Sequence, residues 1–303
     1  MYPELFKIGP FTVYSYGLML GIAFITASWL LTKEIERKKL NPNLATEITI
    51  LAIVFGIVGA KLLHLIENFD AFLNDPVGMA FSPGGLTFFG GLVLAIFAIW
   101  IYARRKKIPF LVIADATAPA LALAYGIGRI GCHLAGDGDY GIPTNLPWGT
   151  NYENGTVPPS IMFQGSEIAK NYPGGIVPNN TPLHPTPIYE FLICVIIFTI
   201  LWKLRKKDLP DLSADKAGGK AGWIDGKLFM IYLLFISIER FSVEFLRLNP
   251  RIIFDLSEAQ LISVGLFFVG IIGLIYFAKN KDLKKFIPPP IEVSQKSKGK
   301  GQK

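Results

Sequence analysis

FLVIADATAPALALAYGIGRIGCHLA, residues 110–135, is an apolar run long enough to cross a bilayer, yet it carries Arg129 near its end. A charge at membrane depth costs about 3 kcal/mol or more to insert, so it normally faces a cavity in the protein and has a function there. Gly128 and Gly131 lie beside it and allow backbone or ligand to come close. We therefore expect the chemistry of the protein at this end of the run.

The composition is that of a membrane protein. Mean hydropathy is +0.42, and 51% of the residues are hydrophobic, gathered into long runs. The first run lacks the basic flank and the cleavage site of a secretory signal, so it counts as a span. Since one span takes roughly 20 apolar residues, we predict an all-α polytopic membrane protein with seven transmembrane helices, at residues 13–31, 46–66, 86–103, 110–135, 187–203, 228–245 and 258–278.

Basic residues predict the orientation. Most of the 30 Lys and Arg residues fall in four stretches, 32–45, 103–109, 203–227 and 278–303. These alternate with stretches poor in Lys and Arg, so the positive-inside rule puts the N-terminus outside and the C-terminus in the cytoplasm. We predict a membrane domain over residues 1–282 and a disordered basic cytoplasmic tail over residues 283–303. The net charge of +7 then comes from basic residues that set the topology and contact anionic lipid, and we expect no nucleic-acid partner.

The longest polar stretch, residues 136–186, falls on the external side between spans four and five. A loop of this length is usually functional or disordered. It is either a cap over a site that opens outward or an insert without a role. Cys132 and Cys194 lie in or beside spans, so we expect no disulfide framework. The sequence indicates no metal site and no organic cofactor.

Charged residues gather near the external ends of spans. Arg129 is followed by Asp137 and Asp139, and it either pairs with a carboxylate or presents its planar fork to an anion such as phosphate. Arg240, Glu244 and Arg247 have the spacing of one helix face. Unpaired, these three charges would cost about 7–10 kcal/mol in a bilayer. We expect Arg240 to pair with Glu244, which leaves Arg247 for another anion.

The fifth span opens with HPTPIYE, residues 184–190. Thr186 is predicted to cap the helix and Pro187 to fit its first turn. Glu190 then either complements the helix dipole or belongs to the site. His184 and Tyr189 are either ordinary interfacial residues or site residues.

Glycines and a tyrosine complete the candidate set. The third span starts with paired glycines that permit either close helix packing or the approach of a lipid headgroup; they are Gly84, Gly85, Gly90 and Gly91. Tyr16 near the external end of the first span is either an interfacial aromatic residue or a hydroxyl in the same site.

Together these motifs resemble one family, the bacterial prolipoprotein diacylglyceryl transferases. The resemblance covers most of the spans and rests on YSYGL at residues 14–18, GGLTF at 84–88, GRIG at 128–131, HPTPIYE at 184–190, the charged segment 240–247 and Gln260. It implies an enzyme of the bacterial cytoplasmic membrane whose active site faces the outer leaflet. Such an enzyme moves the diacylglyceryl group of phosphatidylglycerol to the lipobox cysteine of a prolipoprotein signal peptide and releases glycerol 1-phosphate.

The resemblance also implies roles for the residues. Arg129 and Arg247 would hold the phosphate, and Arg240 with Glu244 would shape the site. Substrate-binding positions would be Tyr16, Gly84, Gly85, Gly90, Gly91, Gly128, Gly131, His184 and Tyr189. A monomer could suffice, since the spans can enclose their own polar cavity.

This sequence departs from the family at the position of the proton acceptor. Phe89 stands where the family usually has a histidine, Cys132 and Ala135 replace asparagines, Asp137 replaces a glutamate and Ile236 replaces a tyrosine. A thiol has a pKa near 8.5 and needs modest help from a cationic pocket to ionise. The remaining candidates for accepting its proton are Asp137, Glu190 and His133.

Two other classes of protein share some of these features. A lipid transporter would keep charges in its spans, but near the midplane and accessible from both sides. A non-catalytic lipid-binding relative could have lost the usual histidine. Transfer of a diacylglyceryl group to a peptide thiol distinguishes an enzyme from both.

Overall fold

The computed structural model describes residues 1–9, 11–82, 84–208, 223–280 and 286. The chain divides into two compact units, residues 1–30 with 110–284 and residues 31–109 with 285–303. Apart from Phe286, the tail predicted at 283–303 lies outside the described residues, as does the end of the predicted membrane domain at 281–282.

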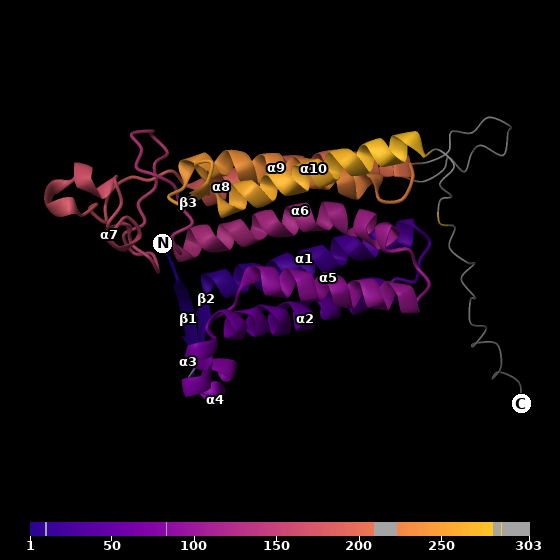
Figure 1. Ribbon diagram of the computed structural model, residues 1–303, viewed down its shortest axis with the longest axis horizontal. Helices are drawn as coiled ribbons and strands as arrows, with labels where there is room; N and C mark the ends of the chain where they lie inside the picture. Colours follow the sequence, from indigo (N-terminus) through magenta and orange to yellow (C-terminus); the bar gives the residue numbers. More distant parts are fainter. Residues whose placement is uncertain (10, 83, 209–222, 281–285, 287–303) are drawn as a thin grey trace, which may run out of the picture. The chain divides into compact units, whose positions relative to one another are not determined.

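The first unit contains most of the helices (Figure 1). Its elements are β1 (Glu4–Ile8), β2 (Phe11–Tyr14), the start of α1 (Ser15–Arg37), α6 (Phe110–Ala135), α7 (Pro159–Met162), η1 (Ala169–Asn171), η2 (Pro173–Gly175), α8 (Thr186–Leu204), η3 (Arg205–Asp208), α9 (Lys227–Val243), η4 (Glu244–Leu246), β3 (Arg251–Ile253), β4 (Leu256–Ser257) and α10 (Glu258–Lys279). The second unit holds the end of α1, α2 (Asn43–Glu67), α3 (Phe69–Asn74), α4 (Pro76–Phe81) and α5 (Phe88–Arg105).

Among the described residues, six helices are long and apolar enough to cross a membrane: α1, α2, α5, α6, α8 continued by η3, and α10. The prediction of an all-α polytopic membrane protein is confirmed, and α6 has the predicted bounds of the fourth span. The sixth predicted span, at residues 228–245, corresponds to α9, which has 17 residues and is not among the six. Two short antiparallel hairpins, β1–β2 and β3–β4, were not predicted.

Helix α6 is the most buried of the six long helices and packs against both α8 and α9, while α9 packs against α10 (Figure 1). Its buried positions are largely alanines, which let neighbouring backbones approach closely. Asp115 interrupts this apolar run for a local reason. Its carboxylate oxygens accept from the amides of Gly226 and Phe229, both at 2.7 Å. Asp115 therefore satisfies donors at the start of α9 that the helix itself leaves free.

In the second unit, α2 packs against α5 through glycines. A Cβ added to Gly59 would lie 2.3 Å from the carbonyl oxygen of Gly90, and one added to Gly90 would lie 2.3 Å from the carbonyl oxygen of Gly59. Only glycine allows the two backbones to come this close. Gly90 thus has the packing role that the sequence left open.

Helix α2 offers a matched pair of substitutions. Gly59→Ala should lower the stability of the protein in detergent by about 1–3 kcal/mol, because α2 and α5 must separate to admit the methyl group. Gly56→Ala, less than one turn away, places its Cβ in open space and should be neutral or stabilising by up to about 1 kcal/mol through helix propensity. Thermal unfolding of both variants checks this, and equal effects would contradict the packing role.

Candidate functional site

Backbone hydrogen bonds tie together three loop segments of the first unit. The amide of Gly141 donates to the carbonyl of His184 at 2.8 Å, and the amide of Ile142 donates to that of Leu246 at 2.8 Å. A Cβ on Gly141 would lie 2.6 Å from the Leu246 oxygen, so this close approach requires glycine. The ends of α6 and η4 and the start of α8 are thereby brought to one place.

The segment 136–186, predicted to be a cap or an insert, has a hydrophobic core of its own, formed by Tyr140, Tyr152, Phe163, Ala169, Val177 and Leu183. The Tyr140 hydroxyl donates to the carbonyl of Val157 at 2.5 Å. Burial raises the pKa of both tyrosines, Tyr140 and Tyr152, so each stays neutral. The segment is therefore a folded part of the unit that holds the loop after α6.

Glu190, the fifth residue of α8, is the common partner of the three predicted arginines. Its Oε2 lies 2.8 Å from Nη2 of Arg247 and 3.3 Å from Nε of Arg129. Its Oε1 lies 3.3 Å from Nη1 of Arg240 and accepts from the hydroxyl of Tyr125 at 3.2 Å. The Glu190 side chain is fully buried. Guanidinium groups from three segments far apart in the sequence therefore meet at one buried carboxylate.

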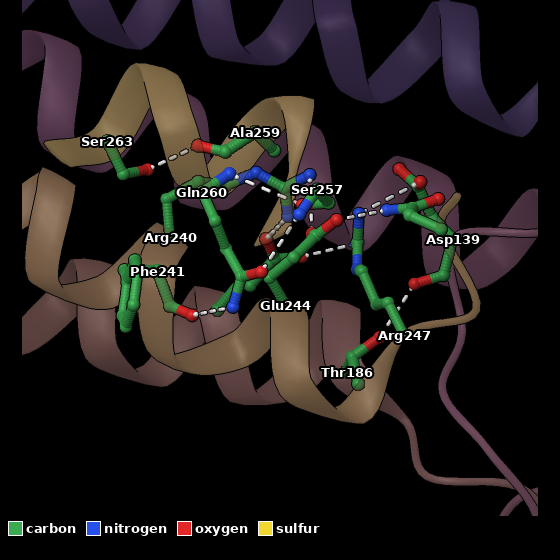
Figure 2. Close-up of polar contacts among 12 residues, drawn as sticks. Asp139, Thr186, Arg240, Phe241, Glu244, Arg247, Ser257, Ala259, Gln260 and Ser263 are labelled. Atoms are coloured by element: carbon green, nitrogen blue, oxygen red, sulfur yellow. Dashed lines mark hydrogen bonds and ion pairs between the residues drawn. The ribbon is translucent and has the colours of Figure 1, made fainter. Parts of the chain in front are cut away.

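Asp139 bridges two of these arginines. One oxygen lies 3.1 Å from Nη1 of Arg247, and the other pairs with Nη1 of Arg129. Figure 2 shows Arg247 reaching toward Asp139, whose backbone carbonyl accepts from the Thr186 hydroxyl at 2.6 Å. Burial alone would raise the pKa of Asp139, but the guanidiniums of Arg247 and Arg129 hold it below its usual value.

Arg240 pairs with Glu244 as predicted, with Nη2 and Oε2 3.0 Å apart. The prediction that Arg240, Glu244 and Arg247 share one helix face is wrong. Helix α9 ends at Val243, the 3₁₀ turn η4 follows, and Arg247 has an extended backbone. The nearby Pro250 cannot continue a helix, which agrees with this ending. Arg247 reaches the cluster because the chain turns and not because the helix continues.

Tyr125 was missed as a member of the cluster. Its hydroxyl accepts from Nη2 of Arg129 at 2.7 Å, and the guanidinium carbon lies 4.7 Å from the ring centroid. The spacing of four residues on one helix was the signal that could have identified it.

Asp137 makes no ion pair with the three arginines among the described residues, although the sequence made it one of three candidates for accepting the thiol proton. Its Oδ1 accepts from the backbone amide of Asp139 at 3.3 Å. Burial and the neighbouring charge of Asp139 raise its pKa. The ligand atoms of Cys132, Asp137 and Asp139 lie within 4.8 Å of one another, but two arginines already occupy Asp139. These guanidiniums would repel a cation, so the cluster suits an anion better than a metal ion.

The two candidate histidines bond to tyrosines. Nδ1 of His133 lies 2.9 Å from the Tyr152 hydroxyl, which ties His133 to the core of segment 136–186. Nδ1 of His184 lies 3.2 Å from the Tyr189 hydroxyl. That hydroxyl also accepts from Nε1 of Trp148 at 2.8 Å, so its own proton points to His184.

Thr186 was predicted to cap α8, and this prediction is wrong. Thr186 is the first helical residue, Pro185 precedes it, and no side-chain cap bond is present there. Because its hydroxyl donates to the Asp139 carbonyl, Thr186 positions the loop instead. Pro187 lies in the first turn as predicted.

The remaining candidates differ in their surroundings. A Cβ on Gly131 would lie 3.3 Å from the ring of Tyr16, so α6 and α1 are close there, whereas a Cβ on Gly128 would meet open space. The glycines of the third span, Gly84, Gly85, Gly90 and Gly91, belong to the second unit. Their part in substrate binding stays a prediction.

Comparison with known proteins points to one family. Residues 3–276 match the family model described as prolipoprotein diacylglyceryl transferase. A phosphatidylglycerol–prolipoprotein diacylglyceryl transferase of Clostridium tetani is 32% identical, over 91% of this chain and 97% of the relative. Similar proteins with the same name occur in Bifidobacterium adolescentis, at 30% identity over 89% of this chain and 76% of the relative, and in a Nostoc species, at 28% over 94% and 93%.

Substitutions of Asp139 and Asp137 should change the stability of the folded protein at neutral pH in opposite directions. The folded-state pKa of Asp139 is lowered, so its charge stabilises the protein at neutral pH, and this is lost as the pH falls through that pKa. Asp139→Asn should therefore destabilise the protein at neutral pH, and this effect should shrink as the solution becomes acidic. The pKa of Asp137 is raised, so Asp137→Asn should stabilise at neutral pH. Thermal unfolding between about pH 3 and pH 8 tests both, and shifts of the same sign would contradict these assignments.

Proposed function

Because the chain belongs to the prolipoprotein diacylglyceryl transferase family, we propose that it transfers the diacylglyceryl group of phosphatidylglycerol to the lipobox cysteine of prolipoproteins. A thioether forms between the cysteine sulfur and the terminal glyceryl carbon, and glycerol 1-phosphate leaves. The protein is a transferase of bacterial lipoprotein biosynthesis, embedded in the membrane from which it takes its lipid substrate.

The convergence of Arg129, Arg240 and Arg247 on Glu190 is the observation that supports this activity best. Guanidinium forks match phosphate oxygens in pairs, and their charge is not lost at any physiological pH. When the bond between the glyceryl carbon and the phosphate oxygen breaks, the phosphate gains negative charge. Preorganised cations at that position stabilise this charge as it develops.

Phosphatidylglycerol has to replace an internal anion to reach these arginines. The three guanidiniums already pair with three carboxylates, those of Glu190, Asp139 and Glu244. Asp139 is the most exposed of the three, with 35% of its side chain accessible, against 0% for the other two. The lipid phosphate takes the place of Asp139 between Arg129 and Arg247. Open space beside Gly128 allows the headgroup to approach there.

We further propose seven spans, the six long helices and α9, with an external N-terminus and a cytoplasmic C-terminus. The 17 residues of α9 lie at the short end of the range for a transmembrane helix, and its Arg240 pairs with Glu190 and Glu244 inside the first unit. The basic stretches between spans support this orientation. In it, the arginine cluster lies under the outer leaflet of the bacterial cytoplasmic membrane. Segment 136–186 lies outside, and a monomer carries the whole site.

Arg129→Lys should reduce transfer by about 10²–10³-fold, the cost of removing one donor to a developing oxyanion. A lysine ammonium cannot replace a planar fork that contacts Tyr125, Asp139 and Glu190 at once. The assay combines the purified protein, phosphatidylglycerol vesicles and a lipobox peptide, and it follows the mass gain of one diacylglyceryl group on the peptide cysteine.

Arg105→Lys is the matched control, because Arg105 is exposed and belongs to the second unit. It should keep the wild-type rate. Wild-type protein that gives no mass gain would contradict the proposed activity and would favour a lipid-binding protein or a transporter. Full activity of Arg129→Lys would contradict only the role of Arg129.

A further inference from the structure

One acidic side chain of the first unit is buried without a partner. Glu239 lies on α9 next to Arg240 and is 2% exposed, and neither of its carboxylate oxygens has a hydrogen-bond partner among the described residues. Buried carboxylates are normally paired, because an unmet acceptor costs about 1–3 kcal/mol and more when it is charged. An unpaired carboxylate beside a cationic site is available for a substrate.

The other buried carboxylates of the cluster are occupied. Each oxygen of Glu190 has two donors close by, which fills the four lone-pair sites of a carboxylate. Glu244 accepts from Nδ2 of Asn249 at 2.5 Å and pairs with Arg240. Neither group can take a proton from a thiol without giving up a bond that holds the site together. Glu239 can.

Glu239 lies on the side of the cluster that faces away from segment 136–186. Its charge acts on Tyr125, one turn before Arg129 on α6, and on Cys194, one turn after Glu190 on α8. It also acts on Tyr232, two turns before Arg240 on α9 itself. Helices α6 and α9 run toward the site and α8 runs away from it, so all three neighbours lie on the same side. In the proposed orientation, this is the side of the bilayer midplane.

The reacting carbon of the lipid also lies on that side. In an outer-leaflet phospholipid, the glyceryl carbon that is attacked is on the acyl-chain side of the phosphate. Substitution at carbon requires the sulfur to approach opposite the leaving oxygen, farther still from the headgroup. His133 and Asp137 follow Arg129 along the chain at the opposite, cap-facing end. Their position is therefore poor for accepting the thiol proton.

We propose, on the basis of the transferase function above, that Glu239 is the catalytic residue that accepts the proton of the lipobox thiol. The S–H proton passes to the Glu239 carboxylate, and the sulfur lone pair forms the bond to the glyceryl carbon. The carbon–oxygen bond breaks, and its electron pair stays on the phosphate of glycerol 1-phosphate. Glu239 thus supplies the base that Phe89 cannot provide.

Charged and titratable groups surround Glu239 from each of these helices. They are Tyr125 and Arg129 of α6, Glu190 and Cys194 of α8, Tyr232 and Arg240 of α9, and Arg247 beyond it. A pH profile alone would mix their effects. The test therefore changes the acidity of the substrate.

Two lipobox peptides are compared, one with cysteine and one with selenocysteine, whose selenol is largely ionised at neutral pH and needs no base. Glu239→Gln should lower the rate with the cysteine peptide by about 10²–10⁴-fold, the usual contribution of a general base. Its rate with the selenocysteine peptide should stay near that of the wild type. Glu239→Asp keeps a carboxylate on a side chain that is one methylene shorter. It should slow the cysteine reaction less than Glu239→Gln does and leave the selenocysteine reaction unchanged.

Ser237→Ala tests whether any substitution at a buried position of α9 slows the reaction. Ser237 is buried, and its hydroxyl donates to the Leu234 carbonyl of its own helix. It should leave both rates unchanged. The proposal is overturned if Glu239→Gln reacts with the cysteine peptide at the wild-type rate. It is also overturned if both peptides slow by the same factor in Glu239→Gln and Glu239→Asp. Failure of the transferase function looks different, since wild-type protein would then modify neither peptide.

Discussion

The ion pairs around Glu190 are the interaction on which the rest of the site depends. One buried carboxylate holds guanidinium groups from α6, from α9 and from the chain after η4. None of these charges could stay at this depth alone, because an uncompensated buried ion destabilises a protein by about 3–5 kcal/mol. The helices that carry them must therefore pack so that the charges meet. The helix packing and the arginine cluster are consequences of the same requirement.

Backbone geometry makes this meeting possible. Gly141 allows the chain after α6 to touch both His184, shortly before α8, and the end of η4, and the Thr186 hydroxyl fixes the carbonyl of Asp139. Ser257 and Gln260 form a capping box at the start of α10, and the Gln260 amide also reaches the Phe241 carbonyl at 3.4 Å (Figure 2). The last helix is thereby tied to α9 beside Arg240.

The sequence predicted the long helices because an apolar run reports directly on burial in lipid, and the bounds of α6 agree to the residue. Charges in spans have to meet a partner or a polar cavity, and only the resemblance to the family predicted that Arg129 and Arg247 share one site, since both would hold the same phosphate. The sequence could not choose Asp139 over Asp137. That choice depends on the path of the loop after α6, where Gly136 and Gly138 both have positive φ. The sequence prediction also extended the sixth span past Val243, because the charged residues keep a helical spacing there. The 3₁₀ turn η4 changes the direction of the chain without changing that spacing.

The proposed anion site contains as many paired carboxylates as arginines, and there is a physical reason for this balance. Three buried guanidiniums without counter-ions would carry a large desolvation cost. Internal carboxylates remove this cost, but they also compete with the substrate. The competition is smallest if the carboxylate that leaves can return to water, and Asp139 is the partly exposed member, on a glycine-rich loop. Glu190 and Glu244 stay buried and keep the arginines in position, so that one anion is exchanged for another and the net charge of the buried cluster changes little.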